Sequence, residues 1–299
     1  MKRTAHLLTL LLSGIAMLSL DAATTGRKGS RNPMPPGITV IRNLVYKEPF
    51  RRPLELDLYR PENSSGPLPV VLWVHGGGWK SGSKDNCPAS WLAAEGFAVA
   101  SINYRLLHDA QWPAQINDCR DAVRWLRTQA ARFQLDPDRI GAWGSSAGGH
   151  LVAILGTIAP PEGETVSSRV QAVCDWFGPA DLLTMPPNIV SADRSPEQVA
   201  RSNGARLLGA AVREVPELAR QASGLHHVSA DDPPFLIMHG DQDPGVPLDQ
   251  SLRLAEALRT AGTDITLQVV KGAGHGGPAF RTPEVRDQVL RFFRRTLKP

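Results

Sequence analysis

One serine of this chain stands at the centre of a glycine-flanked turn with the spacing that nucleophilic catalysis requires. Residues 144–148 read GSSAG, directly after an apolar run that ends at Trp143 and before a helical pattern. In a strand–turn–helix of this kind the apical residue is strained, and the residues two positions away must lack bulk. Only Ser146 has glycine at both positions, because Ser145 would be flanked by Trp143 and Ala147. The pattern therefore predicts Ser146 as an exposed nucleophile.

The base expected for this serine is His275. A serine hydroxyl is a weak nucleophile unless a base accepts its proton, and that base needs a partner that fixes its tautomer. His275 lies in the segment GAGHGG, residues 272–277, after a predicted strand and before the last predicted helix. For the other seven histidines, which include His150 and His239, a structural or surface role is expected.

Two aspartates compete for the role of the acid that orients His275. Both lie in residues 240–247, GDQDPGVP, after a predicted strand. Pro244 and Gly245 place a turn directly behind Asp243, which favours Asp243 as the partner of the histidine. Asp241 is expected to cap or brace the same loop.

A glycine run supplies candidate donors for a negatively charged oxygen. Residues 75–79 read HGGGW after a predicted central strand, so their N–H groups are free of bulky side chains. We assign Gly77 and Gly78 to the oxyanion hole, together with the N–H of Ala147. A phosphate loop is the alternative, but its G-x-x-x-x-G-K-[ST] spacing is absent. This chemistry requires neither a metal nor an organic cofactor.

Short apolar runs alternate with helical patterns and predict the elements that position these residues. Residues 38–46 and 54–59 are expected to pair as antiparallel strands at a sheet edge. The alternation that follows predicts a mostly parallel, doubly wound α/β sheet, which binds ligands at the carboxyl ends of its strands. The predicted strands are 70–75, 97–103, 140–143, 170–176, 235–239 and 265–270, and the predicted helices are 114–133, 147–158, 248–261 and 283–297.

Four of these motifs, in residues 75–79, 143–150, 239–247 and 274–276, resemble the motif set of the α/β-hydrolase superfamily. More narrowly, they are similar to its secreted esterase and lipase-like branch, which includes bifunctional feruloyl and acetyl xylan esterases. The resemblance implies an α/β-hydrolase fold, a mostly parallel sheet with an antiparallel N-terminal edge, and a triad of Ser146, Asp243 and His275.

Residues 182–229 interrupt the alternation and cannot be matched to the family residue by residue. They carry Pro186 and Pro187, mixed polar residues and at least one helical pattern. We expect a small helical insertion over the active site, of the kind that shapes the acyl and alcohol pockets.

The N-terminus has the pattern of a secretory signal peptide at residues 1–23. Lys2 and Arg3 precede an apolar stretch, and the small residues Ala22 and Ala23 follow it. An uncleaved membrane anchor is the alternative, but the apolar stretch is too short and too often interrupted by polar residues for a membrane-spanning helix. We expect a secreted or periplasmic protein without stable membrane insertion after cleavage, a polar lead-in at residues 24–36 and one catalytic domain at residues 37–299.

The composition argues against a nucleic-acid partner. The formal net charge is only +4, and the basic residues are scattered without an aromatic-interleaved stripe. Cys87, Cys119 and Cys174 are widely spaced, so they do not form a CxxC metal pair. The sequence is compatible with two states of these cysteines: one disulfide plus one free thiol, or three free thiols.

These features predict a serine carboxylic-ester hydrolase that works through an acyl-enzyme. The resemblance and the signal peptide imply acetyl or feruloyl esters of plant polysaccharides, or similar small esters, as substrates. A serine peptidase of the prolyl oligopeptidase type is one alternative, but it normally carries a large propeller for which 299 residues leave no room. A non-catalytic binding relative is another, although such relatives usually lack the serine or the histidine.

Overall fold

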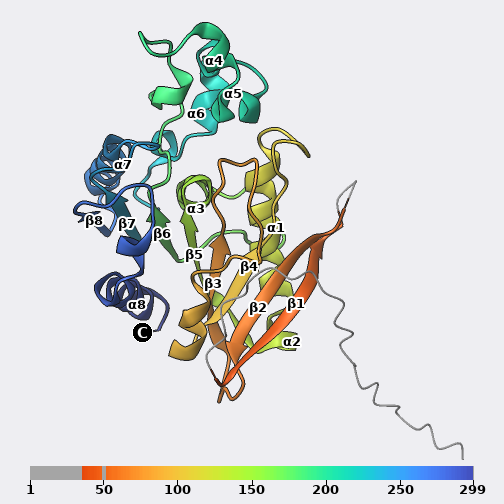
Figure 1. Cartoon of the computed structure of the whole chain (residues 1–299). Coiled ribbons are helices and arrows are strands. Elements are labelled where there is room, and N and C mark those ends of the chain that lie inside the picture. The colour runs from red at the N-terminus through yellow and green to blue at the C-terminus, as the bar shows by residue number, and fades with distance from the viewer. Residues whose placement is uncertain (1–35, 49–51, 299) are drawn as a thin grey trace, which may run out of the picture. The chain divides into compact units, whose positions relative to one another are not determined.

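An eight-stranded sheet forms the centre of the structure, a computed structural model that describes residues 36–48 and 52–298 (Figure 1). The strand order is β1-β2-β4-β3-β5-β6-β7-β8. β1 pairs with β2, and β2 with β4, in antiparallel fashion, whereas the other neighbours are parallel. This confirms the predicted fold class. The strands are β1 (Ile38–Lys47), β2 (Leu54–Pro61), β3 (Leu68–Val74), β4 (Ala98–Ile102), β5 (Leu135–Ser145), β6 (Ala172–Trp176), β7 (Phe235–Gly240) and β8 (Ile265–Val270).

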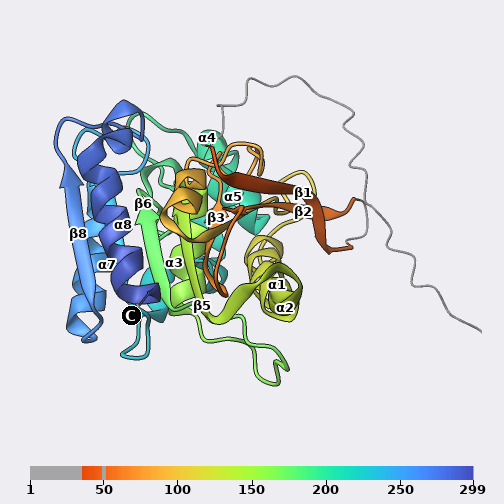
Figure 2. The same ribbon diagram turned by 90° about the horizontal axis from the view of Figure 1, so that it is seen from below.

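Helices cover both faces of the sheet (Figures 1 and 2). Three of them, α1 (Ala114–Thr128), α3 (Ala147–Thr157) and α7 (Leu248–Thr260), pack on one face. The opposite face is covered by α8 (Pro283–Leu297) and by the 3-10 helix η1 (Ser90–Glu95), which is the only helix between β3 and β4. Central strands are therefore buried on both sides, which explains their continuous apolar sequences.

Strand β3 shows how one apolar run serves two cores. Val70, Leu72 and Val74 belong to the cluster beneath α1, α3 and α7. Val71 and Trp73 point the other way, into the cluster beneath α8. Successive side chains of a strand alternate between its faces, so every residue of such a strand must be apolar.

The helix predicted at residues 114–133 is in fact two helices. α1 ends at Thr128, and a short α2 (Ala130–Phe133) follows after Gln129. The break redirects the chain into β5, and Gln134 takes a left-handed conformation with a φ of 51°. The spacing did not reveal the break, because Ala130 and Phe133 are buried and continue the apolar pattern.

Short helices fill the long connection between β6 and β7 and are grouped at the top of Figure 1. This connection contains residues 182–229, where the sequence predicts an insertion. Serine caps define where two of them begin: Ser195 forms a capping box with Gln198, and the Ser202 hydroxyl accepts from the N–H of Ala205. The elements are η2 (Pro186–Asn188), α4 (Pro196–Ala200), α5 (Asn203–Leu208), η3 (Val212–Glu214), α6 (Pro216–Gln221) and η4 (Gly224–His227).

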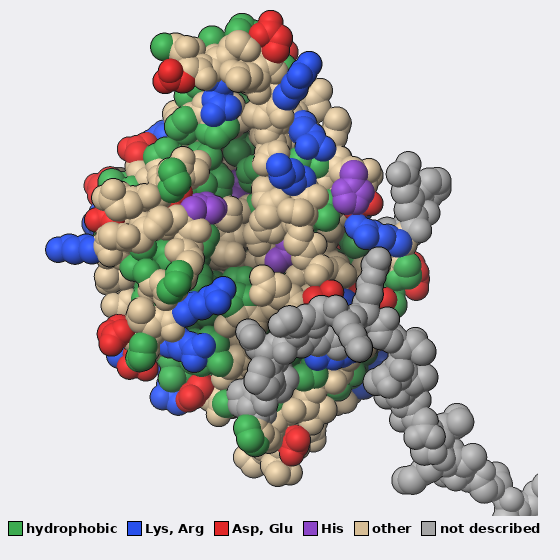
Figure 3. All heavy atoms as spheres, viewed as in Figure 1, with side chains coloured by type: hydrophobic (Ala, Val, Ile, Leu, Met, Phe, Trp, Pro, Cys, Tyr) green, Lys and Arg blue, Asp and Glu red, His purple; other side chains and the backbone are tan. Residues whose placement is uncertain are grey.

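Several predictions lie outside the described residues, namely the signal peptide and the lead-in up to residue 35. Within the described part, Cys87, Cys119 and Cys174 are free thiols. None of its helices combines the length and hydropathy of a membrane span. Basic and acidic side chains are interspersed on the face shown in Figure 3.

A buried ion pair ties the antiparallel edge to the loop that follows the glycine run. The Lys84 ammonium donates to Asp57 Oδ1 and to Asn43 Oδ1, each at 2.7 Å. Arg42 donates to the second carboxylate oxygen of Asp57 at 2.8 Å. The side chains of Asp57 and Lys84 are 0% and 5% exposed. Water therefore cannot replace a missing partner.

Replacing Lys84 by methionine is expected to lower the free energy of unfolding by about 3–5 kcal/mol, because it leaves Asp57 buried with one partner fewer. Urea denaturation measures the change. The matched control is Glu217→Gln at the exposed Arg220–Glu217 pair, where solvent screening predicts little effect. Equal unfolding midpoints for the two variants would contradict a stabilising role of the buried pair.

Candidate active site

Ser146 occupies a strained turn between β5 and α3. Its φ and ψ are 54° and −120°, a region that residues with a side chain rarely adopt. The turn is fixed by the Ser146 N–H, which donates to Trp176 O at 2.8 Å. A Cβ on Gly148 would lie 2.0 Å from Val74 O, and one on Gly144 would lie 2.3 Å from Gly148 O. Both glycines are thus required by the close passage of the chain.

The structure brings Ser146, His275 and Asp243 into one hydrogen-bonded line. His275 Nε2 lies 2.8 Å from Ser146 Oγ, and His275 Nδ1 lies 2.6 Å from Asp243 Oδ2. The three residues follow β5, β8 and β7, whose carboxyl ends meet at the same edge of the sheet. The His275 side chain is 33% exposed, whereas that of Asp243 is fully buried. The line therefore runs from a solvent-facing hydroxyl to a buried carboxylate.

The two candidate aspartates have separate tasks. Asp243 Oδ1 accepts from the N–H groups of Gly245 and Val246, at 2.8 and 2.9 Å. Burial would raise the pKa of Asp243, but hydrogen bonds from two histidines and these N–H groups outweigh it and hold that pKa well below its usual range. Asp241 instead accepts from the N–H of Gly272 at 2.7 Å and so braces the loops after β7 and β8.

The second histidine at Asp243 is His239, for which the sequence predicts a structural or surface role. Its side chain is 0% exposed, and its Nε2 lies 3.3 Å from Asp243 Oδ2 and 2.8 Å from Val246 O. The only signal in the sequence was a polar residue that ends a buried strand four residues before the acid. This spacing does not show which way the ring points.

The predicted oxyanion-hole residues surround the same cavity as the serine. Gly77, Gly78 and Ala147 line a cavity of about 640 Å³ together with Ser146 and His275. Ala147 is the first residue of α3, so its N–H has no acceptor within the helix. Residues 36–48 and 52–298 hold no group of three His, Cys, Asp or Glu that could bind a metal ion.

Both apolar and polar side chains line the cavity. The segment between β6 and β7 supplies most of the apolar lining residues and also two asparagines. Apolar lining residues are Phe177, Pro179, Leu182, Met185, Pro187 and Val246, and polar ones are Ser81, Ser83, Asn86, Asn188 and Asn203. Asn203 lies against the glycine run at residues 75–79, because its Nδ2 is 2.5 Å from where a Cβ of Gly78 would be. No local pattern in the sequence identifies these lining residues, because they meet only in the folded structure.

His150 joins three parts of the site. Trp79, at the end of the glycine run, donates from Nε1 to His150 Nδ1 at 3.3 Å. His150 Nε2 donates to Ala222 O, in the segment between β6 and β7, at 2.7 Å. Burial lowers the pKa of His150 to about 4, although the bond to Ala222 acts in the opposite direction. The ring is therefore neutral near pH 7 and can accept from Trp79.

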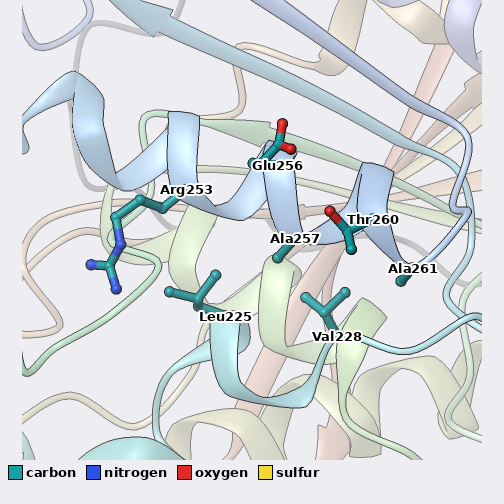
Figure 4. Close-up of a pocket in the computed structure, with 7 residues that line it drawn as sticks. All are labelled: Leu225, Val228, Arg253, Glu256, Ala257, Thr260 and Ala261. Carbon is teal, nitrogen blue, oxygen red and sulfur yellow. The ribbon is translucent and has the colours of Figure 1, made fainter.

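A second hollow, of about 610 Å³, lies between η4 and α7 and contains none of the predicted site residues. Leu225 and Val228 face α7 across it, and Arg253 stands at one end (Figure 4). Arg253 also donates to Asp181 at 3.1 Å. Of these two hollows, only the 640 Å³ cavity contains groups arranged for nucleophilic chemistry.

Comparison with known proteins gives a consistent result. A family model described as BD-FAE matches residues 56–258. Esterase LipC of Mycobacterium tuberculosis is 33% identical over 237 residues, which cover 74% of this chain and 56% of LipC. The chain spans about half the length of the curated relatives it matches.

Two solved structures are similar over nearly their whole length. A truncated carbohydrate esterase from gut microbiota superposes with a TM-score of 0.76 at 32% identity and covers 87% of this chain and 97% of its own. Esterase 2 of Thermogutta terrifontis, phosphoramylated by tabun, has a TM-score of 0.70 at 28% identity. The superposition covers 89% of this chain and 98% of the Thermogutta chain.

The buried ionisable groups near the site predict opposite pH effects on stability. Because the pKa of His150 is lowered to about 4, the unfolded chain alone binds this proton between pH 6.5 and 4, and stability falls on acidification. Burial raises the pKa of Asp175 to about 6, so the folded chain alone binds that proton between pH 6 and 3.8, and stability rises on acidification.

Two substitutions separate these effects. His150→Gln keeps a donor for Ala222 and is expected to flatten the fall in unfolding free energy by about 1.4 kcal/mol per pH unit. Asp175→Asn is expected to steepen the same fall. Urea denaturation between pH 4 and 7 measures both slopes, and slopes identical to that of the wild type would refute the assignment.

Proposed function

Because this chain belongs to the BD-FAE family of α/β-hydrolase serine esterases, we propose that it hydrolyses carboxylic esters through an acyl-enzyme on Ser146. The observation that carries the proposal is the unbroken line from Ser146 through His275 to Asp243, with distances of 2.8 and 2.6 Å. This is the geometry in which a serine hydroxyl loses its proton as it attacks.

Each half of the reaction uses the same groups. Ser146 Oγ attacks the ester carbonyl carbon while its proton passes to His275 Nε2, and Asp243 stabilises the resulting imidazolium. The N–H groups of Gly77, Gly78 and Ala147 bind the negative oxygen of the tetrahedral intermediate. His275 then returns the proton to the departing alcohol. In the second half His275 takes a proton from water, whose oxygen attacks the acyl carbon, and returns it to Ser146 Oγ as the bond to the serine breaks and the acid leaves.

The proposed substrates are acetyl or feruloyl esters of carbohydrates. The similarity to a carbohydrate esterase supports a sugar as the alcohol part. A cavity of about 640 Å³ with both apolar and polar lining residues suits an ester that joins an acyl group to a hydroxylated alcohol. We further propose secretion or periplasmic export after removal of residues 1–23, which N-terminal sequencing of the exported protein would test.

Ser146→Ala is expected to lower kcat for aryl esters by roughly 10⁴-fold to 10⁶-fold, because the nucleophile is removed. A second readout is covalent labelling, since the Thermogutta esterase 2 structure is phosphoramylated by tabun. Paraoxon should phosphorylate the wild type at Ser146 and leave Ser146→Ala unmodified, as intact-mass spectrometry would show. An unlabelled wild type would point to a non-catalytic binding protein.

A substrate panel tests the specificity. Aryl acetate, butyrate, feruloyl and long-chain esters, acetylated xylan and a proline-containing peptide should be assayed with Ser146→Ala as the blank. We expect rapid cleavage of the acetyl or feruloyl compounds and no cleavage of the peptide. Cleavage of aryl acetates without release from any acylated polysaccharide would exclude the carbohydrate substrate and keep the esterase. Preferential peptide cleavage would replace the esterase by a peptidase.

A further inference from the structure

We propose that His239 and Ser251 form a positioning pair that holds the Asp243 carboxylate in line with His275. The inference rests on the proposed function, in which Asp243 is the acid of the triad. His239 is the penultimate residue of β7 and Ser251 lies in α7, so the pair connects a helix of the scaffold to the catalytic line. Neither residue touches the reacting hydroxyl, and both act through Asp243.

The surroundings of His239 determine which ring nitrogen carries a proton. Nε2 faces two acceptors, Val246 O at 2.8 Å and Asp243 Oδ2 at 3.3 Å, so this nitrogen is the donor. Nδ1 lies 2.6 Å from Ser251 Oγ, and with the proton on Nε2 this nitrogen accepts from the Ser251 hydroxyl. Ser251 is 0% exposed, and no solvent competes for this bond. The serine therefore fixes the tautomer in which His239 donates toward Asp243.

His239 holds both ends of the turn that presents the carboxylate. Within this turn, Asp243 Oδ1 accepts from the N–H groups of Gly245 and Val246. His239 Nε2 adds a hydrogen bond to the Val246 carbonyl and a longer contact to Asp243 Oδ2. Rotation of the carboxylate would break at least one of these interactions. Asp243 Oδ2 is thereby kept at 2.6 Å from His275 Nδ1.

Few other groups face His239. The Phe177 ring stands edge-on at 6.4 Å between centroids. Asp175 on β6 lies on the same face of the sheet, because its partner in the ladder, Ile237, is two residues before His239. Asp243 and Asp175 are thus the carboxylates beside this ring, and only Asp243 is in direct contact with it.

Matched substitutions divide the contributions of the pair. His239→Gln keeps an amide donor near the position of Nε2, whereas His239→Leu removes it. We expect His239→Leu to lower kcat by roughly 10-fold to 100-fold with little change in KM, because a misplaced acid costs up to about 10² in rate. His239→Gln should stay within about threefold of the wild type, and Ser251→Ala should fall between these two variants.

Two readouts distinguish positioning from a merely structural role. Without the donor on Oδ2, the Asp243 carboxylate is no longer held in line with His275 and stabilises its imidazolium less, so the acid limb of the kcat/KM profile of His239→Leu should move to lower pH. In an Asp243→Ala background, His239→Leu should cause no further loss of kcat, because the residue acts through the carboxylate.

The possible outcomes are separable. An unchanged kcat and acid limb in a folded His239→Leu variant, or a full additional loss in the Asp243→Ala background, would overturn the positioning role. If His239→Leu does not fold, Ser251→Ala, which loses one hydroxyl, carries the same comparison. A wild type that cleaves no ester would contradict the proposed function, and the rates of phosphorylation by paraoxon would then still rank the variants.

Discussion

The site depends on the close packing of the chain around the turn that carries Ser146. The carbonyl of Val74, at the end of β3, sits where any side chain at residue 148 would have to lie, since a Cβ there would be 2.0 Å from that oxygen. The same strand end leads into the glycine run, and a Cβ on Gly76 would lie 3.2 Å from that of Ser146. The close passage of β3 beside the turn at residues 144–148 therefore requires glycine at residue 148. It also brings the glycine run at residues 75–79 next to Ser146.

The acid and the base reach this serine because neighbouring parallel strands end at one edge. The loops after β7 and β8 pass so closely that a Cβ on Gly240 would lie 2.2 Å from Ala273 O. Asp241 joins the two loops through the N–H of Gly272. His275 is therefore placed by contacts between loops, and Asp243 by a turn in which the N–H groups of Gly245 and Val246 donate to its carboxylate.

A buried, neutral histidine connects the reacting groups to the wall of the cavity. His150 accepts from Trp79 of the glycine run and donates to Ala222. These two hydrogen bonds connect the segment between β6 and β7 to α3, which begins directly after Ser146. Buried polar groups of this kind are costly unless they are paired, and here each ring nitrogen has a partner. The segment between β6 and β7 that lines the cavity is consequently coupled to the glycine run at residues 75–79.

The sequence by itself determined the α/β order and the identity of Ser146, Asp243 and His275 as candidates, because strand patterns, glycine spacing and turn residues act over a few neighbouring positions. It also favoured Asp243 over Asp241, since Pro244 and Gly245 mark the turn locally. Only the tertiary structure decided the break after α1, the contact of His239 with Asp243 and the residues of the cavity wall. These features depend on contacts between elements that are far apart in the chain. The spacing of residues along one segment shows which of them share a face, but not which other segment they contact.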